Sequence, residues 1–294
     1  MAAGRVRPVF YFYGQPRFMP IIQQILERIL IRSRSPILRR QLLQWLYARK
    51  GMRFGGVEAV GPYFLMTVDE AVLPAEQPLW NVTAAQYRVN CERISLARCT
   101  LRPGDTVVDI GAGLGEEAVV YATLVGPGGS VHCLEPQPAV YAVLQEVAAR
   151  QPHFNVHTYP YALYEADAPV AIGGADEPYE AARIGTGGGS TVPGIRLDTL
   201  LSQVGADRIR LLKVNVEGAE RYLLNEAFLP SLRRIDHLAI ACHDFRFRQE
   251  GDPFFQTRRL VTDFFTAHGF SVTSQQSGEE WLDDWLYISP PEKV

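Results

Sequence analysis

The chain has 294 residues, of which 47% are hydrophobic and 21% are charged, and its formal net charge is −3. These values are typical of a soluble globular protein with one large α/β domain, or with a catalytic domain and a smaller companion. The four cysteines are scattered without a Cys-x-x-Cys pair, which argues against a zinc site or a disulfide framework and suits a reducing compartment. We expect a cytoplasmic protein without a secretory signal or membrane-spanning segment, because even the apolar stretch Phe18–Ile31 is interrupted by polar side chains.

The charge is unevenly distributed along the chain. Residues 1–53 contain eleven basic side chains and one acid, Glu27, for a net charge of +10, so the remainder carries −13. Such asymmetry marks the N-terminal segment as a separate functional region. We expect its arginines either to dock on the acidic body or to contact an anionic surface, such as lipid headgroups or a phosphorylated substrate.

Residues 1–85 are predicted to form a basic helical arm with a small β element. Ile21–Leu30 places its apolar residues at helical spacing, and a second helix follows Pro36 and stops near Gly51. Val57–Val68 is predicted to be a short hairpin or a pair of strands.

Strands and helices alternate over residues 86–294, which predicts a mainly parallel sheet covered on both faces. The predicted strands are Thr106–Ile110, Ser130–Leu134, Asn155–Tyr159, Arg210–Val216, Ile235–Cys242, Phe270–Thr273 and Trp285–Ser289, and the helices include Glu116–Leu124, Pro138–Arg150 and Thr257–Ala267. Ligands bind such sheets beyond the carboxyl ends of the strands. The glycine-rich stretch Gly173–Gly194, between the third and fourth strands, is predicted to be either a lid over substrate or a surface insertion.

The first of these strands ends in a glycine-rich turn, Asp109-Ile110-Gly111-Ala112-Gly113-Leu114-Gly115. The alternating glycines allow a sharp turn and a close approach of the backbone to a ligand, since no Cβ is in the way. The following helix presents free N–H groups to a ligand carboxylate or hydroxyl. On its own such a loop is weak evidence for a nucleotide site.

Two further features favour S-adenosylmethionine over a nicotinamide or flavin cofactor. Dinucleotide sites normally have Gly-x-Gly-x-x-Gly spacing, whereas Glu116 takes the place of the last glycine here and would repel a pyrophosphate. Glu135 closes the next strand, where a carboxylate can accept hydrogen bonds from both ribose hydroxyls. The residues assigned to the cofactor are Asp109, Gly111, Ala112, Gly113, Gly115, Glu135 and Pro136. A turn or capping role is the alternative for Asp109 alone.

A second unusual stretch, Lys213–Glu220, lies at the end of the fourth strand. Lys213, Asn215 and Glu217 alternate there, so we expect their side chains to point to one side. Charges in a buried strand are costly unless they are paired or used. The stretch is therefore predicted to hold either an internal Lys213–Glu217 pair with Asn215 as a spacer or part of the active site.

The chain contains four motifs in this order: Asp109–Gly115, Glu135-Pro136, Leu197-Asp198-Thr199-Leu200 and Lys213–Glu220. In this order the chain resembles the FkbM-type methyltransferases, which have an Asp-x-Gly-Ala-x-x-Gly loop, a Glu-Pro strand end, a Leu-Asp-Thr-Leu element and a Lys-x-Asp-x-Glu-Gly-x-Glu strand. The resemblance covers about Tyr87 to Pro290. It implies a Rossmann-like methyltransferase fold with a mostly parallel seven-stranded sheet, and O-methylation of a hydroxyl on a sugar, glycan or other secondary metabolite.

Asn215 departs from this family pattern, which has an aspartate at its position. An amide cannot act as a base, and it is a poorer ligand for a divalent cation than a carboxylate. We therefore assign no metal ligands, and a divalent metal stays open only as a disfavoured cofactor. A shift of substrate or a loss of activity also stays open, so a non-catalytic cofactor-binding module anchored by the basic arm is one alternative.

The fifth strand is followed by His243 and Asp244, at the edge where the acceptor should bind. A hydroxyl acceptor needs a base or a neighbouring cation, and His243 is the best base by its intrinsic pKa. Asp244 could orient His243 or act alone, and Lys213 and Glu217 are further catalytic candidates. A histidine that only caps the strand end is the alternative.

Position alone predicts further cofactor contacts. Ala162 and its neighbour Tyr161 follow the third strand and are expected to line the adenine pocket, and Asn215 lies at the cofactor edge of the sheet. Glu92 precedes the glycine loop on a predicted helix and is expected to reach the amino end of the cofactor.

The leading hypothesis is an O-methyltransferase for a hydroxyl of a small molecule or glycan. The glycine spacing disfavours a nicotinamide-dependent oxidoreductase. The acidic body and the lack of an Asn-Pro-Pro-aromatic motif disfavour a nucleic-acid methyltransferase, although the basic arm keeps that alternative open. The arm also predicts peripheral contact with an anionic membrane surface, and no feature indicates an oligomeric state.

Overall fold

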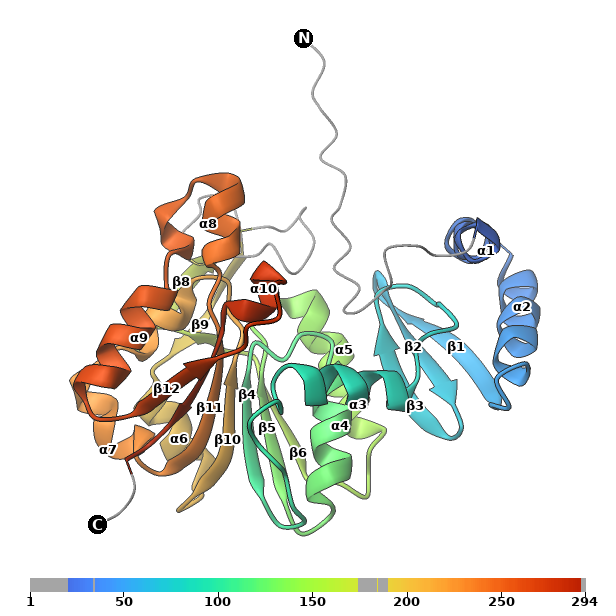
Figure 1. The fold of residues 1–294 in the computed structure, drawn as a ribbon. Coiled ribbons are helices and arrows are strands. Elements are labelled where there is room, and N and C mark those ends of the chain that lie inside the picture. Colours follow the sequence, from blue (N-terminus) through green and yellow to red (C-terminus); the bar gives the residue numbers. More distant parts are fainter. Residues whose placement is uncertain (1–20, 34, 174–183, 185–189, 292–294) are drawn as a thin grey trace.

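A seven-stranded sheet lies at the centre of the computed structural model, which describes residues 21–33, 35–173, 184 and 190–291 (Figure 1). The strand order is β12-β13-β11-β10-β4-β5-β6. The strands are β4 (Thr106–Ile110), β5 (Ser130–Leu134), β6 (Val156–Tyr159), β10 (Ile209–Val214), β11 (Ile235–Ala241), β12 (Ser271–Ser274) and β13 (Trp285–Ser289). The pairings among β6, β5, β4, β10 and β11 are parallel, and β13 is antiparallel to both neighbours. The predicted mostly parallel, Rossmann-like sheet is confirmed.

The order of the sheet reverses between β4 and β10, because β5 and β6 lie on one side of β4 and β10 and β11 on the other. The carboxyl ends of β4 and β10 are therefore adjacent, with Ile110 opposite Val214. In parallel α/β sheets such a switch point is where ligands bind. The two unusual sequence stretches meet at this place.

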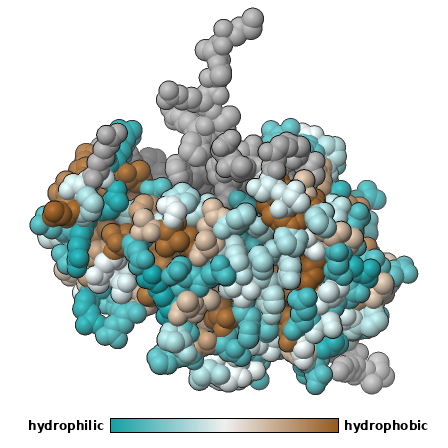
Figure 2. Space-filling view, turned by 180° about the vertical axis from the view of Figure 1, so that it is seen from behind, coloured by the Kyte–Doolittle hydropathy of each residue, from teal (hydrophilic) through white to brown (hydrophobic). Residues whose placement is uncertain are grey.

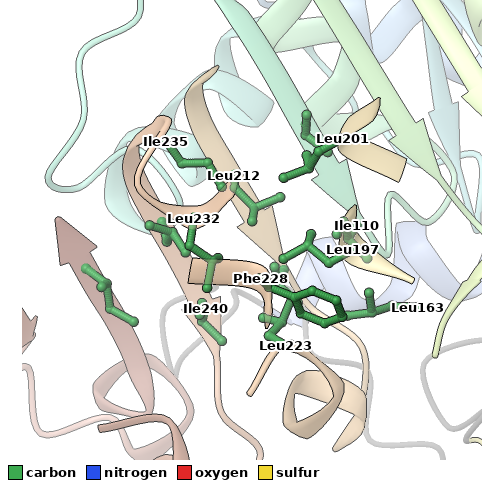
Figure 3. Packing of buried hydrophobic residues seen from close by; sticks show 14 of the residues in the cluster. Ile110, Leu163, Leu197, Leu201, Leu212, Leu223, Phe228, Leu232, Ile235 and Ile240 are labelled. Atoms are coloured by element: carbon green, nitrogen blue, oxygen red, sulfur yellow. The ribbon is translucent and has the colours of Figure 1, made fainter. Parts of the chain in front are cut away.

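Both faces of the sheet are covered, because consecutive strand residues face opposite sides. Val107 and Leu211 pack in one apolar cluster with residues of α4, whereas Val108 and Leu212 pack in another with α6 and α9. Figure 3 shows part of this second cluster, with Leu212 and the α6 residues Leu197 and Leu201 labelled. The α-helices of this part are α3 (Ala84–Arg93), α4 (Glu116–Val125), α5 (Pro138–Ala149), α6 (Leu197–Val204), α7 (Leu229–Leu232), α8 (Asp244–Glu250), α9 (Arg258–Ala267) and α10 (Glu280–Asp283). Short 3-10 helices among the described residues are η2 (Ala219–Leu223), η3 (Glu226–Phe228) and η4 (Pro253–Phe255).

The N-terminal extension consists of α1 (Ile21–Arg32), α2 (Pro36–Ala48) and an antiparallel sheet of β1 (Phe54–Val60), β2 (Tyr63–Val68) and β3 (Ala71–Ala75). The predicted hairpin thus has a third strand. The extension shares one apolar cluster with the α/β part, in which Leu43 and Phe54 join Val119 of α4 and Val143 of α5. Apolar packing therefore joins the two parts. The arginines of residues 1–53 were expected to dock on the acidic body or to contact an anionic surface. Among the described residues, Arg53 forms an ion pair with Glu70, which belongs to the extension itself.

A second three-stranded sheet follows β6 and was not predicted. It contains β7 (Ala162–Leu163), β8 (Pro169–Ile172) and β9 (Ser190–Ile195), in the order β7-β9-β8. Pro169 and Pro193 lie opposite each other in this sheet. A proline within a segment argues against a strand, so these strands were not indicated by the sequence. The predicted lid, Gly173–Gly194, lies mostly outside the described residues. No helix within the described ranges is long and apolar enough to cross a bilayer.

Candidate functional site

The glycine loop is held between β5 and β10. The N–H groups of Gly111 and Ala112 donate to the Leu134 carbonyl at 3.0 and 2.9 Å, and the N–H of Asn215 donates to the Ile110 carbonyl at 3.0 Å. Gly111, Gly113 and Gly115 have φ angles of 78°, 57° and 98°, which L side chains rarely adopt. A Cβ on Gly111 would lie 2.0 Å from the Asn215 carbonyl oxygen. Backbone shape and close packing thus both require this glycine.

Glu135 follows β5 and faces the loop. Its side chain is buried, with Oε2 accepting from the Gly113 N–H at 3.1 Å and Oε1 from the Gln137 N–H at 2.9 Å. Burial raises the pKa of Glu135 to about 7, and the two backbone hydrogen bonds limit the rise. Each oxygen keeps a further lone pair, so the carboxylate can still accept two hydroxyl donors. Pro136 separates Glu135 from the start of α5.

A buried ion cluster supports the loop from behind. The Lys213 ammonium lies 2.8 Å from Asp109 Oδ1 and 3.0 Å from Glu117 Oε2, and it donates to the Gly111 carbonyl at 2.8 Å. Lys213 and Asp109 are almost fully buried. The predicted Lys213–Glu217 pair is therefore wrong, because Lys213 points into the β4–α4 contact. Burial alone would lower the pKa of Lys213, but the two carboxylates raise the pKa by more than burial lowers it. This ammonium therefore stays charged and is no base at neutral pH.

Burial raises the pKa of Asp109 to about 6, although Lys213 opposes the rise. Glu117 is held in turn by Ser95, whose hydroxyl donates to Glu117 Oε1 at 2.6 Å. Sequence reasoning missed Glu117. Its only signal was the place in the first turn of the helix that follows the loop. Asp109 and Glu117 together hold the cation that fixes the loop.

A second charged cluster lies after the carboxyl ends of β10 and β11. His243 is 3% exposed, with Nδ1 2.5 Å from Glu220 Oε1 and Nε2 3.1 Å from Glu217 Oε1. Glu217 Oε2 also pairs with Arg246 at 2.5 Å. Burial would lower the pKa of His243, but the two glutamates outweigh it and raise the pKa to about 10. His243 is therefore an imidazolium near neutral pH with both ring nitrogens engaged, and the structure opposes its predicted role as the base.

Glu217 and Asp244 also differ from the sequence expectation. The strand ends at Val214, and Glu217 adopts a left-handed φ of 52°, so strand alternation does not set its direction. Asp244 was expected to orient His243 or to act alone, but its Oδ2 accepts from the N–H groups of Thr257 and Arg258 at 3.0 and 2.8 Å. Asp244 therefore caps the start of α9. Glu220 orients His243 instead. It is the last residue of the Glu-Gly-x-Glu motif, and the sequence alone assigned no role to it.

The remaining predicted contacts are spread more widely. Ala162 is buried at the start of β7, and Asn215 lies at the β10 end beside the loop. Glu92 is about half exposed on α3 and pairs with Arg88 one turn before it, so its carboxylate is engaged on the helix surface. A cavity of about 430 Å³ lies between β9 and α6, and its lining includes Thr199, Gln203 and Tyr161, which was expected to line the adenine pocket.

The described residues hold no group of three histidine, cysteine or acidic side chains placed to bind a metal ion.

The family model "Methyltransferase FkbM domain" matches residues 109–272, which is more than half of the chain and includes both charged clusters. The chain belongs to the FkbM methyltransferase family. This FkbM-family protein is thus an S-adenosylmethionine-dependent methyltransferase.

Among known relatives, the FkbM-family chain is 26% identical over 249 residues to the 31-O-demethyl-FK506 methyltransferase FkbM of Streptomyces tacrolimicus, which covers 71% of this chain and 91% of the relative. Among solved structures it is similar to cofactor-bound Rv0187 from MTB, with 14% identity, a TM-score of 0.45 and coverage of 95% and 100%. Fibrillarin from Aeropyrum pernix with natively bound S-adenosyl-L-methionine gives 11% identity, a TM-score of 0.42 and coverage of 80% and 98%.

The residues of the FkbM-family site fit S-adenosylmethionine. Glu135 has free acceptor capacity for a ribose diol in a buried place, where hydrogen bonds to a carboxylate are strong. The backbone of the glycine loop lies next to the Glu135 carboxylate, since the Gly113 N–H donates to it directly. This arrangement suits the ribose of a nucleoside such as that of S-adenosylmethionine.

The close approach of Gly111 to Asn215 predicts a large effect of Gly111→Ala. Gly104 has a φ of 92° but open space around its missing Cβ, so Gly104→Ala is a control for backbone strain alone. We expect Gly104→Ala to lower the free energy of unfolding by about 1 kcal/mol, and Gly111→Ala by about 3 kcal/mol or more because the β10 end must also move. Urea unfolding measures both values. Equal losses would contradict the proposed contact.

His243 predicts a pH-dependent stability. Its folded pKa of about 10 lies above the usual 6.5, so its contribution is complete below pH 6.5 and is lost as the pH rises through 10. We expect His243→Gln to lower the free energy of unfolding by about 3 kcal/mol at pH 7 and by less at pH 10. Burial lowers the pKa of His237, so His237→Gln should leave the slope between pH 7 and 10 unchanged. A constant difference between wild type and His243→Gln across this range would refute the charged state of His243.

Proposed function

We propose that the enzyme transfers the methyl group of S-adenosylmethionine to a hydroxyl oxygen of a small molecule or glycan. The observation that carries this proposal is the Glu217 carboxylate, which is 19% exposed and held on one oxygen each by His243 and Arg246. It follows β10, the strand beside the glycine loop. An acceptor that reaches the methyl group from this edge would meet a fixed hydrogen-bond acceptor.

Glu217 is suited to orient a hydroxyl and to accept its proton. Burial raises its pKa, but His243 and Arg246 lower it more, so the group is ionised at neutral pH. A carboxylate in this state accepts the hydrogen bond of the acceptor hydroxyl and aims the oxygen lone pair. S-adenosylmethionine, when bound, would supply a methyl group on a sulfonium whose sulfur keeps the electron pair of the broken S–C bond. Glu217 would take the proton of the acceptor hydroxyl through their hydrogen bond as the O–C bond forms.

His243 acts in this proposal as a positioning residue. Its two nitrogens bridge Glu217 and Glu220, and Glu220 is fully buried, so the bridge fixes Glu217 to the end of β11. The relative from Streptomyces tacrolimicus, whose name specifies methylation at an oxygen, supports an oxygen acceptor for this chain as well. A product mass spectrum with isotope-labelled cofactor and hydroxylated extracts tests the reaction. A labelled methyl on nitrogen or carbon would overturn the proposal.

We also propose that the enzyme works in the cytoplasm and makes peripheral contact with a membrane. Its four cysteines are free thiols in buried positions, which suits a reducing compartment. The basic N-terminal helices support the peripheral contact.

The role of Glu217 predicts that Glu217→Gln lowers kcat/KM by roughly 100-fold, because the amide orients the acceptor hydroxyl poorly and takes no proton. Cofactor affinity should stay within about twofold, since no cofactor contact is lost in this proposal. Glu250→Gln is the matched control, because Glu250 pairs with the same Arg246 from the exposed side of α8. Steady-state formation of S-adenosylhomocysteine and calorimetric binding separate the two effects. Equal losses in Glu217→Gln and Glu250→Gln would remove Glu217 from the reaction.

Glu135 predicts that cofactor binding releases a proton. The pKa of Glu135 is about 7, and hydroxyl donors favour the ionised carboxylate, so binding near pH 7 should release about half a proton. Titration calorimetry in buffers of different ionisation enthalpy measures this number. Glu135→Gln should abolish the release and weaken binding roughly tenfold or more, whereas Glu146→Gln on the exposed face of α5 should change neither. Buffer-independent heats for the wild type would contradict the assignment.

A further inference from the structure

Exposed apolar side chains are concentrated on the two N-terminal helices. Eight large hydrophobic residues are exposed within the described ranges, and six of them lie on α1 and α2. They form what we call the outer apolar face: Ile25, Ile29, Ile31, Ile37, Leu38 and Trp45. Ile37 is 71% exposed and Trp45 is 50% exposed. In Figure 2, hydrophobic side chains reach the surface among hydrophilic ones at the left, where these helices lie.

Helix α2 is apolar on two opposite sides. Leu43, Leu46 and Tyr47 face the core, and the Tyr47 hydroxyl donates to the carbonyls of Leu79 and Val82 at 3.0 and 2.7 Å. At 100° per residue, Ile37 and Trp45 lie on the other side of the helix. A surface helix normally shows charged and polar residues there. Packing in the core therefore explains the apolar residues on one side of α2 but not those on the exposed side.

The outer apolar face is surrounded by positive charge. Arg28 and Arg32 of α1 and Arg40 of α2 are exposed beside it, and the Arg49 guanidinium lies 4.9 Å from the centre of the Trp45 ring. The single acid of residues 1–53 is Glu27. Arg39 donates to the carbonyls of Leu30 and Ser33, which fixes the end of α1 against α2. Apolar residues and arginines thus lie together on the exposed side of α1 and α2, which we call the platform.

We infer that this platform binds an anionic lipid bilayer, with the outer apolar face in the boundary between headgroups and acyl chains. Apolar side chains combined with a cluster of arginines are the features that bind such surfaces, since phosphate headgroups neutralise the cations. A second copy would bring two strongly positive segments together and is disfavoured by repulsion. This inference deepens the proposed peripheral location and does not depend on methyl transfer.

Co-sedimentation of the full-length protein with vesicles tests it. We expect binding to phosphatidylcholine vesicles with 30% phosphatidylserine, and at least tenfold weaker binding to pure phosphatidylcholine or at high salt. Ile37→Gln with Trp45→Gln should lower the partition coefficient at least tenfold, and each of Arg28→Gln and Arg40→Gln roughly fivefold. The fluorescence of Trp45 should shift to the blue with anionic vesicles and should be quenched by brominated lipid.

The two exposed apolar residues outside this platform provide matched controls. Val89→Gln and Leu260→Gln remove similar exposed side chains from α3 and α9, and Arg259→Gln removes an exposed arginine, so none of them should change vesicle binding. Equal binding to neutral and anionic vesicles would overturn the inference. So would a dimer in light scattering that Trp45→Gln dissociates while vesicles bind nothing. Cofactor turnover in solution is measured on the same samples, so loss of lipid binding with intact turnover is distinguished from failure of the proposed reaction.

Discussion

The contact of Lys213 with Asp109, Glu117 and the Gly111 carbonyl is the interaction on which the site depends. It joins β10, β4 and α4 at one buried cation. Burying these charges costs several kcal/mol per ion unless each is paired and hydrogen-bonded. The cluster meets that condition on the cation side, because Lys213 directs its ammonium to three oxygens. In return the glycine loop has a fixed position relative to the switch point of the sheet.

The order of motifs in the sequence was enough to predict the sheet and the family. Periodicity predicted β4, β5 and β13 with correct ends, because these strands are short apolar runs between clear turns. Lys213 was predicted less well, since its partner Asp109 lies directly opposite on the neighbouring parallel strand, more than 100 residues earlier. A local pattern offers Glu217 as the nearest opposite charge. Only strand register, which depends on the whole sheet, shows that Asp109 is closer.

His243 illustrates a different limit. Its intrinsic pKa indicates a base, and this argument is correct for an imidazole in water. The fold places it between Glu217 and Glu220, and the same residue then becomes a fixed cation. Residue type predicted that the position carries charge chemistry. The three-dimensional neighbours decided its sign, and they come from a turn with a left-handed residue that strand periodicity cannot describe.

The extension is connected to the site mainly through its core, and the ion pair of Arg150 with Glu58 of β1 adds to this contact. Leu114, inside the glycine loop, is fully buried in the apolar cluster that contains Leu43, Tyr47 and Leu73 of the extension. The inner side of α2 and β1–β3 therefore supports the loop that receives the cofactor, whereas the outer side of α1 and α2 faces away from that cluster. A deletion of the extension would remove both at once and expose the α4 and α5 surfaces to water. Substitutions on the outer apolar face leave the packing of Leu114 intact, so they can separate a role in attachment from a role in holding the loop.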